Sequence, residues 1–405
     1  MTTINRCSFC SIATEDLTSF IYDNKELFIC NSCIAGLIKN SNYNTDSAKL
    51  FSFNLQKPQE IKTFLDNYVI GQEETKKKLA IAVYNHYKRI QEQLSKKQYN
   101  DTEKDIEIEK SNILLIGNTG TGKTYLAKTL AKIINVPFCI ADATSLTQAG
   151  YVGEDVEMIL TRLYQESGEN ITATERGIVY IDEIDKIGRK GDNPSITRDV
   201  SGEGVQQALL KIIEGSKVKI SPQGGRKHPE HKMITINTNN ILFICGGAFE
   251  GIERIIQNRM KKQYLGFTAD NNNKYVNKDE VVKNIIPDDL KKFGLIPELI
   301  GRLPIISTLD SITKNDLKNI LTEPKNSLIN QYKRLFSIDH IELSFEEKAI
   351  EVIINEAYEL QLGARGLRTI CEKVLQEYMY NAPSDDTIKN ITITSDYVES
   401  RLKSQ

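Results

Sequence analysis

The stretch that decides the fold of this chain is Gly117-Asn118-Thr119-Gly120-Thr121-Gly122-Lys123-Thr124. It fits the phosphate-loop pattern G-x-x-x-x-G-K-S/T, in which Lys123 reaches the outer phosphates and the Thr124 hydroxyl binds Mg²⁺. Backbone N–H groups and a helix N-terminus in such a loop face phosphate oxygens. The apolar run Ile113–Ile116 before the loop predicts a buried strand, and Tyr125–Ala131 after it predicts a helix. Because motif, strand and helix agree, a chance match is a weak alternative, and we expect the chain to bind a nucleoside triphosphate.

Two carboxylates follow another predicted buried strand, Ile178–Ile181. This is a Walker B arrangement, in which Asp182 holds Mg²⁺ through water and Glu183 polarises the water that attacks the γ-phosphate. Catalysis of this kind is mainly positioning and charge stabilisation. The alternative, an exposed acidic strand end, is weak beside a phosphate loop.

Phosphoryl transfer also needs cations near the transferred group. Two arginines are candidates: Arg302, just before the predicted strand Pro304–Thr308, and Arg365, in the segment Gly363–Arg368 of the C-terminal domain. Residue patterns alone do not single them out, and for each the alternative is a surface salt bridge.

The seven cysteines form two sets. Cys139, Cys245 and Cys371 are isolated in apolar surroundings, which is typical of small buried side chains. The other four make two C-x-x-C pairs, which at this spacing predict one closed tetrahedral site for structural Zn²⁺; they are Cys7, Cys10, Cys30 and Cys33. Two disulfides are the alternative, and a reducing compartment disfavours them.

Composition is ordinary for a globular protein: 405 residues, 40% hydrophobic, 26% charged, with a formal net charge of -2. No strong positive field therefore indicates nucleic acid or an anionic membrane as a partner. The N-terminus lacks an apolar signal core, and no run is long enough to span a bilayer. We expect a cytoplasmic protein without membrane contact.

Apolar runs alternate with helical patterns from Ser111 to about Thr308, which predicts an α/β domain with a parallel sheet. The runs are Ile113–Ile116, Pro137–Ala141, Ile178–Ile181, Ile241–Cys245 and Pro304–Thr308. Beyond Leu309 we expect helices over 312–335 and 345–380, and a strand only near Ile391–Ile393. Upstream of the sheet, helices are expected over 61–66 and 73–87. The predicted organisation is a zinc-binding domain (1–40), a linker (41–57), a large α/β ATPase domain (58–310) and a small, mainly helical C-terminal domain (311–405).

Taken together, these motifs resemble the ClpX family of AAA+ protein unfoldases over nearly the whole chain. The resemblance implies a homohexameric ring that uses ATP and Mg²⁺ to pull tagged or unfolded proteins through an axial pore. The ring would deliver them to a ClpP-type peptidase, and would act as a chaperone without it. It also implies that the zinc domain docks adaptor proteins, and that the chain has no peptidase activity of its own.

The resemblance assigns further roles residue by residue. Val69 and Ile70 match the pocket for the adenine base, Arg302 the arginine finger, and Arg365 the sensor-2 arginine. Gly246-Gly247-Ala248 stands where a polar sensor-1 residue is usual, so none is assigned.

Three segments match surfaces that act on other proteins. Tyr151 and Val152 match the pore loop that grips substrate, and Arg198 falls in the second pore loop. Without the resemblance, Tyr151 would be an ordinary loop aromatic. Two tripeptides complete the set: Arg226-Lys227-His228, matching the pore-entrance loop that attracts carboxylate-ended tags, and Leu265-Gly266-Phe267, matching the loop that docks on ClpP.

Two alternatives stay open. A zinc ribbon beside an AAA+ ATPase is compatible with a nucleic-acid motor or loader, although the near-neutral charge argues against it. A remodelling chaperone that works without a peptidase is the other.

Overall fold

The structure is a computed structural model of the full chain, and it describes residues 7, 10, 17–22, 25–30, 33, 55–99, 108–147, 154–188, 202–222, 233–263, 278–360, 362–385 and 387–403. The chain divides into two compact units, Met1–Ser52 and Phe53–Gln405. In the first unit, β1 (Leu17–Tyr22) and β2 (Lys25–Cys30) pair as an antiparallel hairpin.

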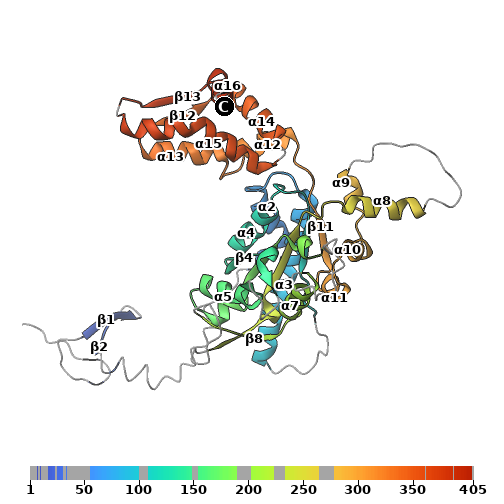
Figure 1. The fold of residues 1–405 in the computed structure, drawn as a ribbon. Coiled ribbons are helices and arrows are strands. Elements are labelled where there is room, and N and C mark those ends of the chain that lie inside the picture. Colours follow the sequence, from blue (N-terminus) through green and yellow to red (C-terminus); the bar gives the residue numbers. More distant parts are fainter. Residues whose placement is uncertain are drawn as a thin grey trace, which may run out of the picture. The chain divides into compact units, whose positions relative to one another are not determined.

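The second unit contains a five-stranded sheet in which every strand pair is parallel (Figure 1). All five strands were predicted from the apolar runs, and the predicted parallel α/β sheet is confirmed. Their order across the sheet is β11 (Ile305–Thr308), β3 (Ile113–Ile116), β10 (Leu242–Gly247), β7 (Ile178–Asp182) and β4 (Phe138–Asp142).

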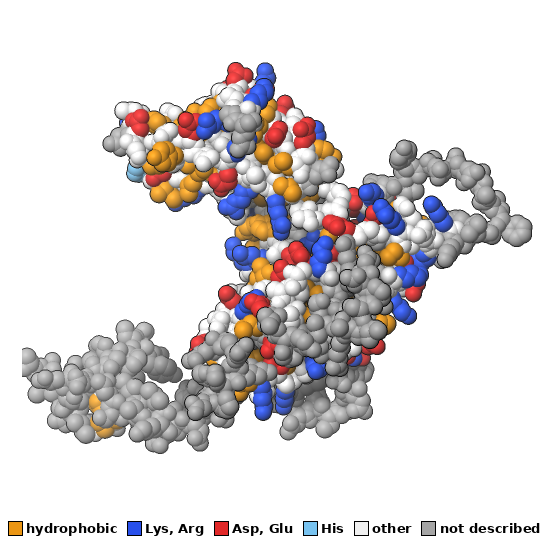
Figure 2. Space-filling model, in the orientation of Figure 1, with side chains coloured by type: hydrophobic (Ala, Val, Ile, Leu, Met, Phe, Trp, Pro, Cys, Tyr) orange, Lys and Arg blue, Asp and Glu red, His pale blue; other side chains and the backbone are white. Residues whose placement is uncertain are grey.

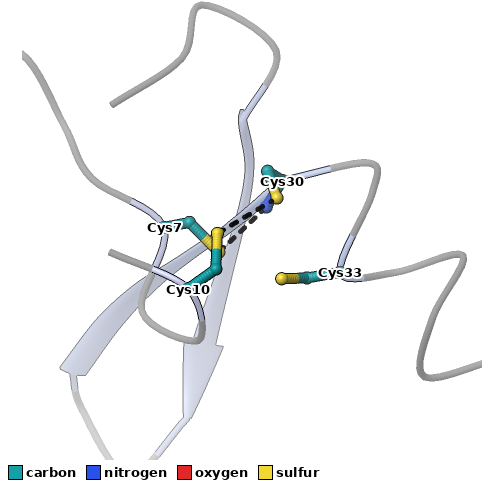
Figure 3. Close-up of side chains that lie close together, drawn as sticks. All are labelled: Cys7, Cys10, Cys30 and Cys33. Atoms are coloured by element: carbon teal, nitrogen blue, oxygen red, sulfur yellow. Dashed lines mark hydrogen bonds between the residues drawn. The ribbon is translucent and has the colours of Figure 1, made fainter. Parts of the chain in front are cut away.

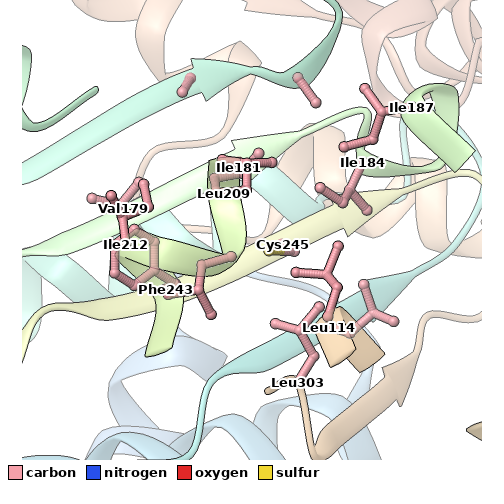
Figure 4. Close-up of a cluster of buried hydrophobic side chains, with 14 of the residues drawn as sticks. Leu114, Val179, Ile181, Ile184, Ile187, Leu209, Ile212, Phe243, Cys245 and Leu303 are labelled. Atoms are coloured by element: carbon pink, nitrogen blue, oxygen red, sulfur yellow. The ribbon is translucent and has the colours of Figure 1, made fainter. Parts of the chain in front are cut away.

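Both faces of the sheet are buried, because side chains alternate between two separate cores. Leu114 and Ile181 enter one core together with residues of α5 (Glu157–Glu166), α7 (Glu203–Glu214) and α8 (Ile252–Gln263). Figure 4 shows this core, with Leu209 and Ile212 of α7 packed over Val179, Ile181 and Phe243. The opposite core is closed by α2 (Pro58–Asp66), α3 (Glu73–Tyr99) and α4 (Lys123–Ile134).

Shorter elements surround this sheet. They are η2 (Ala143–Ser145), β5 (Leu146–Thr147), β6 (Glu154–Asp155), α6 (Ile171–Thr174), η3 (Ile184–Gly188), β8 (Lys217–Ile220), β9 (Ile234–Asn237), η4 (Thr238–Asn240), α9 (Lys278–Val282), α10 (Pro287–Phe293) and α11 (Pro297–Gly301). No helix among the described residues is both long and apolar enough to cross a bilayer.

The C-terminal part is mainly helical, as predicted, with its own buried core. Its elements are α12 (Lys314–Thr322), α13 (Leu328–Ile338), β12 (Glu342–Phe345), α14 (Glu347–Glu359), α15 (Ala364–Asn381), η5 (Ala382–Ser384), β13 (Asn390–Ile393) and α16 (Ser395–Lys403).

Three expectations about helices and strands were wrong. The predicted helices over 312–335 and 345–380 are each broken, the first near Pro324 and the second at Gly363, whose φ of 57° favours glycine. The strand β12, which pairs in parallel with β13, was not expected. In the other direction, α3 extends beyond Tyr87 to Tyr99.

Three basic side chains lie together against η4: His86 and Arg89, which are buried, and Lys110, which is half-buried. His86 Nε2 lies 3.1 Å from the Asn240 carbonyl oxygen, and Arg89 Nη2 donates to the Asn239 carbonyl at 2.9 Å. Lys110 Nζ donates to the Thr238 carbonyl at 3.0 Å. Burial, followed by the charges of Arg89 and Lys110, lowers the pKa of His86 to about 3, so the native imidazole is neutral at physiological pH.

This cluster makes the fold acid-sensitive. The unfolded chain takes up a proton on His86 near pH 6.5 whereas the folded chain does not, so stability falls as pH drops below 6.5, by about 2 kcal/mol at pH 5. We expect the wild-type Tm to fall by several degrees more between pH 7 and pH 5 than that of His86→Gln, which cannot gain the proton. His340→Asn, at an exposed left-handed position, should keep the wild-type slope. Equal slopes for His86→Gln and wild type would contradict this.

Candidate functional site

The phosphate loop leaves β3 at its C-terminal end and enters α4. Gly120 and Gly122 have φ of 83° and 96°, so the loop makes two left-handed turns that glycine permits. The Gly117 N–H donates to the Gly247 carbonyl at 3.1 Å, which ties the loop to the end of β10. The N-terminus of α4 thus faces the loop interior, where its free N–H groups suit an anion.

Lys123 is folded over the loop. Its ammonium donates to the carbonyl oxygens of Gly117, at 2.6 Å, and Asn118, at 3.0 Å. Burial lowers the Lys123 pKa, while the carboxylates of Asp182 and Asp185 oppose that effect. The Lys123 ammonium therefore donates to loop carbonyls with the same N–H groups that could donate to phosphate oxygens.

A carboxylate and a hydroxyl meet beside the loop. Thr124 Oγ1 donates to Asp182 Oδ2 at 3.0 Å, and the other carboxylate oxygen accepts from the Tyr180 hydroxyl at 3.1 Å and the Glu183 N–H at 3.0 Å. Oxygen donors of this type are those Mg²⁺ prefers. The strand end and the first turn of α4 therefore fit a magnesium ion.

Glu183 is exposed and has a φ of 56°, which is uncommon for a residue other than glycine. Backbone strain of this kind gathers at functional sites, where the surrounding structure holds it in place. The Glu183 carboxylate lines the same cavity as Lys123 and Asp182.

The two larger cavities that adjoin the loop have volumes of about 440 and 410 Å³. Arg365 lines the first together with Lys123 and Glu183. Val69 and Ile70 line the second, beside α12. Both are bordered by the same group of residues, so they form one cleft between the α/β part and the C-terminal part: Tyr68, Gly120, Gly122, Tyr125, Ile320 and Ala364.

The two parts touch through backbone at the phosphate loop. A Cβ on Gly120 would collide with the Leu362 carbonyl oxygen, and one on Gly363 would lie 3.0 Å from the Gly120 carbonyl oxygen. The Ala364 N–H points at that same Gly120 oxygen, 3.4 Å away. Neither glycine leaves room for a side chain.

Arg302 is not a lining residue of this cleft. It follows α11, and its Nε donates to Glu214 Oε1 at 3.0 Å, with both side chains roughly half exposed. The structure therefore brings Arg365 to the phosphate loop of its own chain, but not Arg302.

Pattern reasoning missed Asp185, which is 1% exposed. Its Oδ1 accepts from the Ala248 N–H at 3.2 Å, just beyond the end of β10. Oδ2 has no hydrogen-bond partner, although Lys186 Nζ lies 3.9 Å away. No local pattern distinguishes Asp185 from other acids near a strand end, because its partner Ala248 is 63 residues away in the sequence.

The four candidate zinc ligands come together in the first unit (Figure 3). Their sulfur atoms all lie within 4.8 Å of one another, and those of Cys10 and Cys30 are 3.6 Å apart. Tetrahedral Zn²⁺ with Zn–S bonds of 2.3 Å requires sulfurs about 3.8 Å apart. The Cys30 N–H also points at Cys7 Sγ, 3.4 Å away. The residues fit a closed, structural zinc site.

The remaining predicted site residues lie outside the described part of the chain. They are Tyr151, Val152, Arg198, Arg226, Lys227, His228, Leu265, Gly266 and Phe267.

Comparison with known proteins identifies the families that this chain resembles. Residues 108–306 match the family model for the AAA domain (Cdc48 subfamily), and residues 312–395 match the C-terminal, D2-small domain, of ClpB protein. The chain is 51% identical over 408 residues to the ATP-dependent Clp protease ATP-binding subunit ClpX of Bacteroides thetaiotaomicron, covering 99% of this chain and 96% of that one.

Two further relatives carry the same name. That of Bacteroides fragilis is 51% identical, over 98% of this chain and 95% of its own, and that of Porphyromonas gingivalis is 48% identical, over 98% and 96%. At about 50% identity over nearly the whole length of these relatives, the chain belongs to the ClpX family of AAA+ ATP-binding subunits.

Proposed function

We propose that this chain is an ATP-driven unfoldase that pulls tagged or unfolded proteins through the pore of a homohexamer and delivers them to a ClpP-type peptidase. Without the peptidase it acts as a remodelling chaperone. The main support for the proposal is the cleft between the two AAA+ parts, where the phosphate loop, the Walker B carboxylates and Arg365 lie together. The membership of the chain in the ClpX family is the second support. The working division is zinc domain 1–40, linker 41–57, ATPase domain 58–310 and small domain 311–405, in the cytoplasm.

The cleft offers one set of residues to the base of ATP and another to its phosphates. Val69 and Ile70 contact the base, and the N–H groups of Gly117–Gly122 bind the phosphates. Lys123 turns from its own loop carbonyls to the outer phosphates. Asp182 and Thr124 hold Mg²⁺, which neutralises charge that develops on the phosphate oxygens.

Two further side chains complete the hydrolytic site. Glu183 orients and polarises the attacking water, and Arg365 contacts the γ-phosphate from the small domain. The location of both beside Lys123 supports these roles.

The location of Arg302 is compatible with a role in an oligomer. Its side chain is half exposed and lies away from the cleft of its own chain, so it is available to the site of a neighbouring copy. An arginine supplied in this way contributes about 10³–10⁵ in rate.

The substrate and partner loops are proposed from the resemblance, and the described elements beside them are compatible. The parallel pair β5–β6 flanks Tyr151 and Val152, and the hairpin β8–β9 flanks Arg226–His228. Leu265–Phe267 falls between α8 and α9. Arg198 belongs to the second pore loop, and the zinc domain receives adaptor proteins.

Protein is the proposed substrate rather than nucleic acid. On the face drawn in Figure 2, the described Lys and Arg side chains are interspersed with Asp and Glu, which does not favour a polyanion. DNA-stimulated ATPase activity would favour the alternative.

The test is degradation of a stably folded protein with a short C-terminal tag by a ClpP-type peptidase. We expect loss of the folded substrate only when ATP, the tag and this chain are all present. The untagged protein and ADP are the controls. Persistence of the folded substrate while ATP is hydrolysed would contradict the proposal.

Leu265→Glu tests peptidase docking. Placing a charge in an apolar anchor is expected to cost at least about 2 kcal/mol per docking site, which is more than tenfold in affinity. Degradation should be lost while ATPase activity and unfolding remain. Asn272→Glu adds the same charge within the same polar stretch and should degrade normally. Tight peptidase binding by Leu265→Glu would remove this tripeptide from docking.

A further inference from the structure

The segment that joins the two AAA+ parts makes two hydrogen bonds with the buried side chain of Gln72. Residues 309–313 connect β11 with α12, and the Gln72 amide bonds both main-chain groups of Asp310 within this hinge. Gln72 Nε2 donates to the Asp310 carbonyl at 2.8 Å, and the Asp310 N–H donates to Gln72 Oε1 at 2.9 Å. Gln72 is 9% exposed. Because donor and acceptor are both matched, the pair fixes the orientation of the hinge peptide as well as its position.

The same residue ends the turn that lines the base cavity. Gln72 has a φ of 58° and follows Gly71 at 67°, so this backbone is strained for a residue with a side chain. On its other side the turn is held by Lys76, which is 2% exposed and donates to the Val69 carbonyl at 3.1 Å and to Asp66 at 2.5 Å. The turn therefore cannot shift while Gln72 keeps both bonds, and the hinge peptide cannot rotate without breaking them.

The next hinge residue is held from the phosphate end. Asn118 of the phosphate loop donates to Ser311 Oγ at 3.2 Å, and Ser311 Oγ donates to Asp279 Oδ1 at 2.8 Å. Successive hinge residues thus contact the two ends of the nucleotide cleft: Asp310 the base turn, and Ser311 the phosphate loop.

We propose that Gln72 is a positioning residue that couples occupation of the base cavity to the angle of the hinge between the ATPase and small domains. The inference rests on the proposed binding of a nucleoside triphosphate in this cleft. A base seated against Val69 and Ile70 fixes the turn, and Gln72 passes that constraint to the Asp310 peptide. The hinge then holds Arg365 at the phosphates. Gln72 itself does not touch the reacting atoms.

Two variants test the coupling in the full chain. Gln72→Glu keeps the size and the acceptor for the Asp310 N–H, but sets a carboxylate oxygen against the Asp310 carbonyl. Gln72→Met keeps the length and removes both bonds. Gln59→Glu makes the same chemical change at an exposed position of α2 and is the matched control.

The readouts are steady-state ATP hydrolysis and the distance between two probes. The probes are introduced as unnatural amino acids at Lys88, exposed on α3, and Tyr380, exposed on α15, so that the cysteines stay unlabelled. For both Gln72 variants we expect kcat to fall at least about tenfold with KM within about threefold, because coupling rather than binding is removed. The ATP-dependent change in probe distance should disappear, with Tm near wild type.

Wild-type kcat and distance change in both variants would overturn the proposal. So would a rise in KM with an unchanged kcat, since that is the result of a binding defect alone. Neither readout involves substrate protein or peptidase. Failure of the degradation assay therefore bears on the proposed function, and failure here bears on Gln72.

Discussion

Glu183→Gln is expected to bind ATP with near wild-type affinity and to hydrolyse it about 10²–10⁴-fold more slowly. The amide keeps the size of the side chain and the strained backbone at this position, but it cannot polarise the attacking water. Lys123, Thr124 and Asp182 remain to bind phosphate and Mg²⁺, so affinity should survive.

Equilibrium binding of a fluorescent ATP analogue and phosphate release under saturating ATP separate the two effects. Glu253→Gln, in the first turn of α8 and outside the cavity that holds Lys123, should behave as wild type. Turnover close to normal in Glu183→Gln would exclude this residue as the base.

Arg302→Ala is expected to lower turnover by about 10³–10⁵ while sparing ATP binding. The proposed cause is loss of a cation from the site of a neighbouring copy, because Arg302 lies outside the cleft of its own chain. The defect should therefore be repaired in mixed rings. In such a ring, the site of an Arg302→Ala subunit has an intact Glu183. A neighbouring Glu183→Gln subunit supplies an intact Arg302 to it, so that this one site has every group.

ATP hydrolysis measured across mixing ratios tests this directly, since neither variant alone is active. Arg254→Ala, an exposed arginine on α8, controls for loss of surface charge. Glu214→Gln controls for loss of the Arg302 ion pair, which as a surface pair is worth about 0–1 kcal/mol. Absence of activity at every ratio, or an equal defect in Glu214→Gln, would refute a role in trans.

The sheet was predictable because parallel strands buried on both faces are near-continuous apolar runs. The small domain was harder. Glu342–Phe345 alternates polar and apolar residues over four positions, and it becomes a strand only through its pairing with Asn390–Ile393. Pairing with a distant strand, rather than the local residue pattern, makes this segment a strand. The local pattern predicted only that a helix would begin at residue 345.

Some residues of the nucleotide cleft were likewise predictable from local sequence, and others were not. The phosphate loop and Walker B carboxylates are local motifs, so the sequence predicted where they would lie. The sequence assigned no role to Gln72, since its partner Asp310 is 238 residues away. Asp185 likewise acquires its environment only when β10 lies beside η3. Contacts between distant segments carry no local pattern.

The backbone contact between Gly120 and Gly363 bears on how such chains can be recombined. Because main-chain atoms form this contact, it is indifferent to the identity of surrounding side chains. A small domain taken from a distant relative should therefore keep this particular contact with the phosphate loop if both glycines are retained. A methyl group on Gly120 would collide with the Leu362 carbonyl oxygen and force the two halves apart at this point, so a recombined chain keeps the contact only with glycine there.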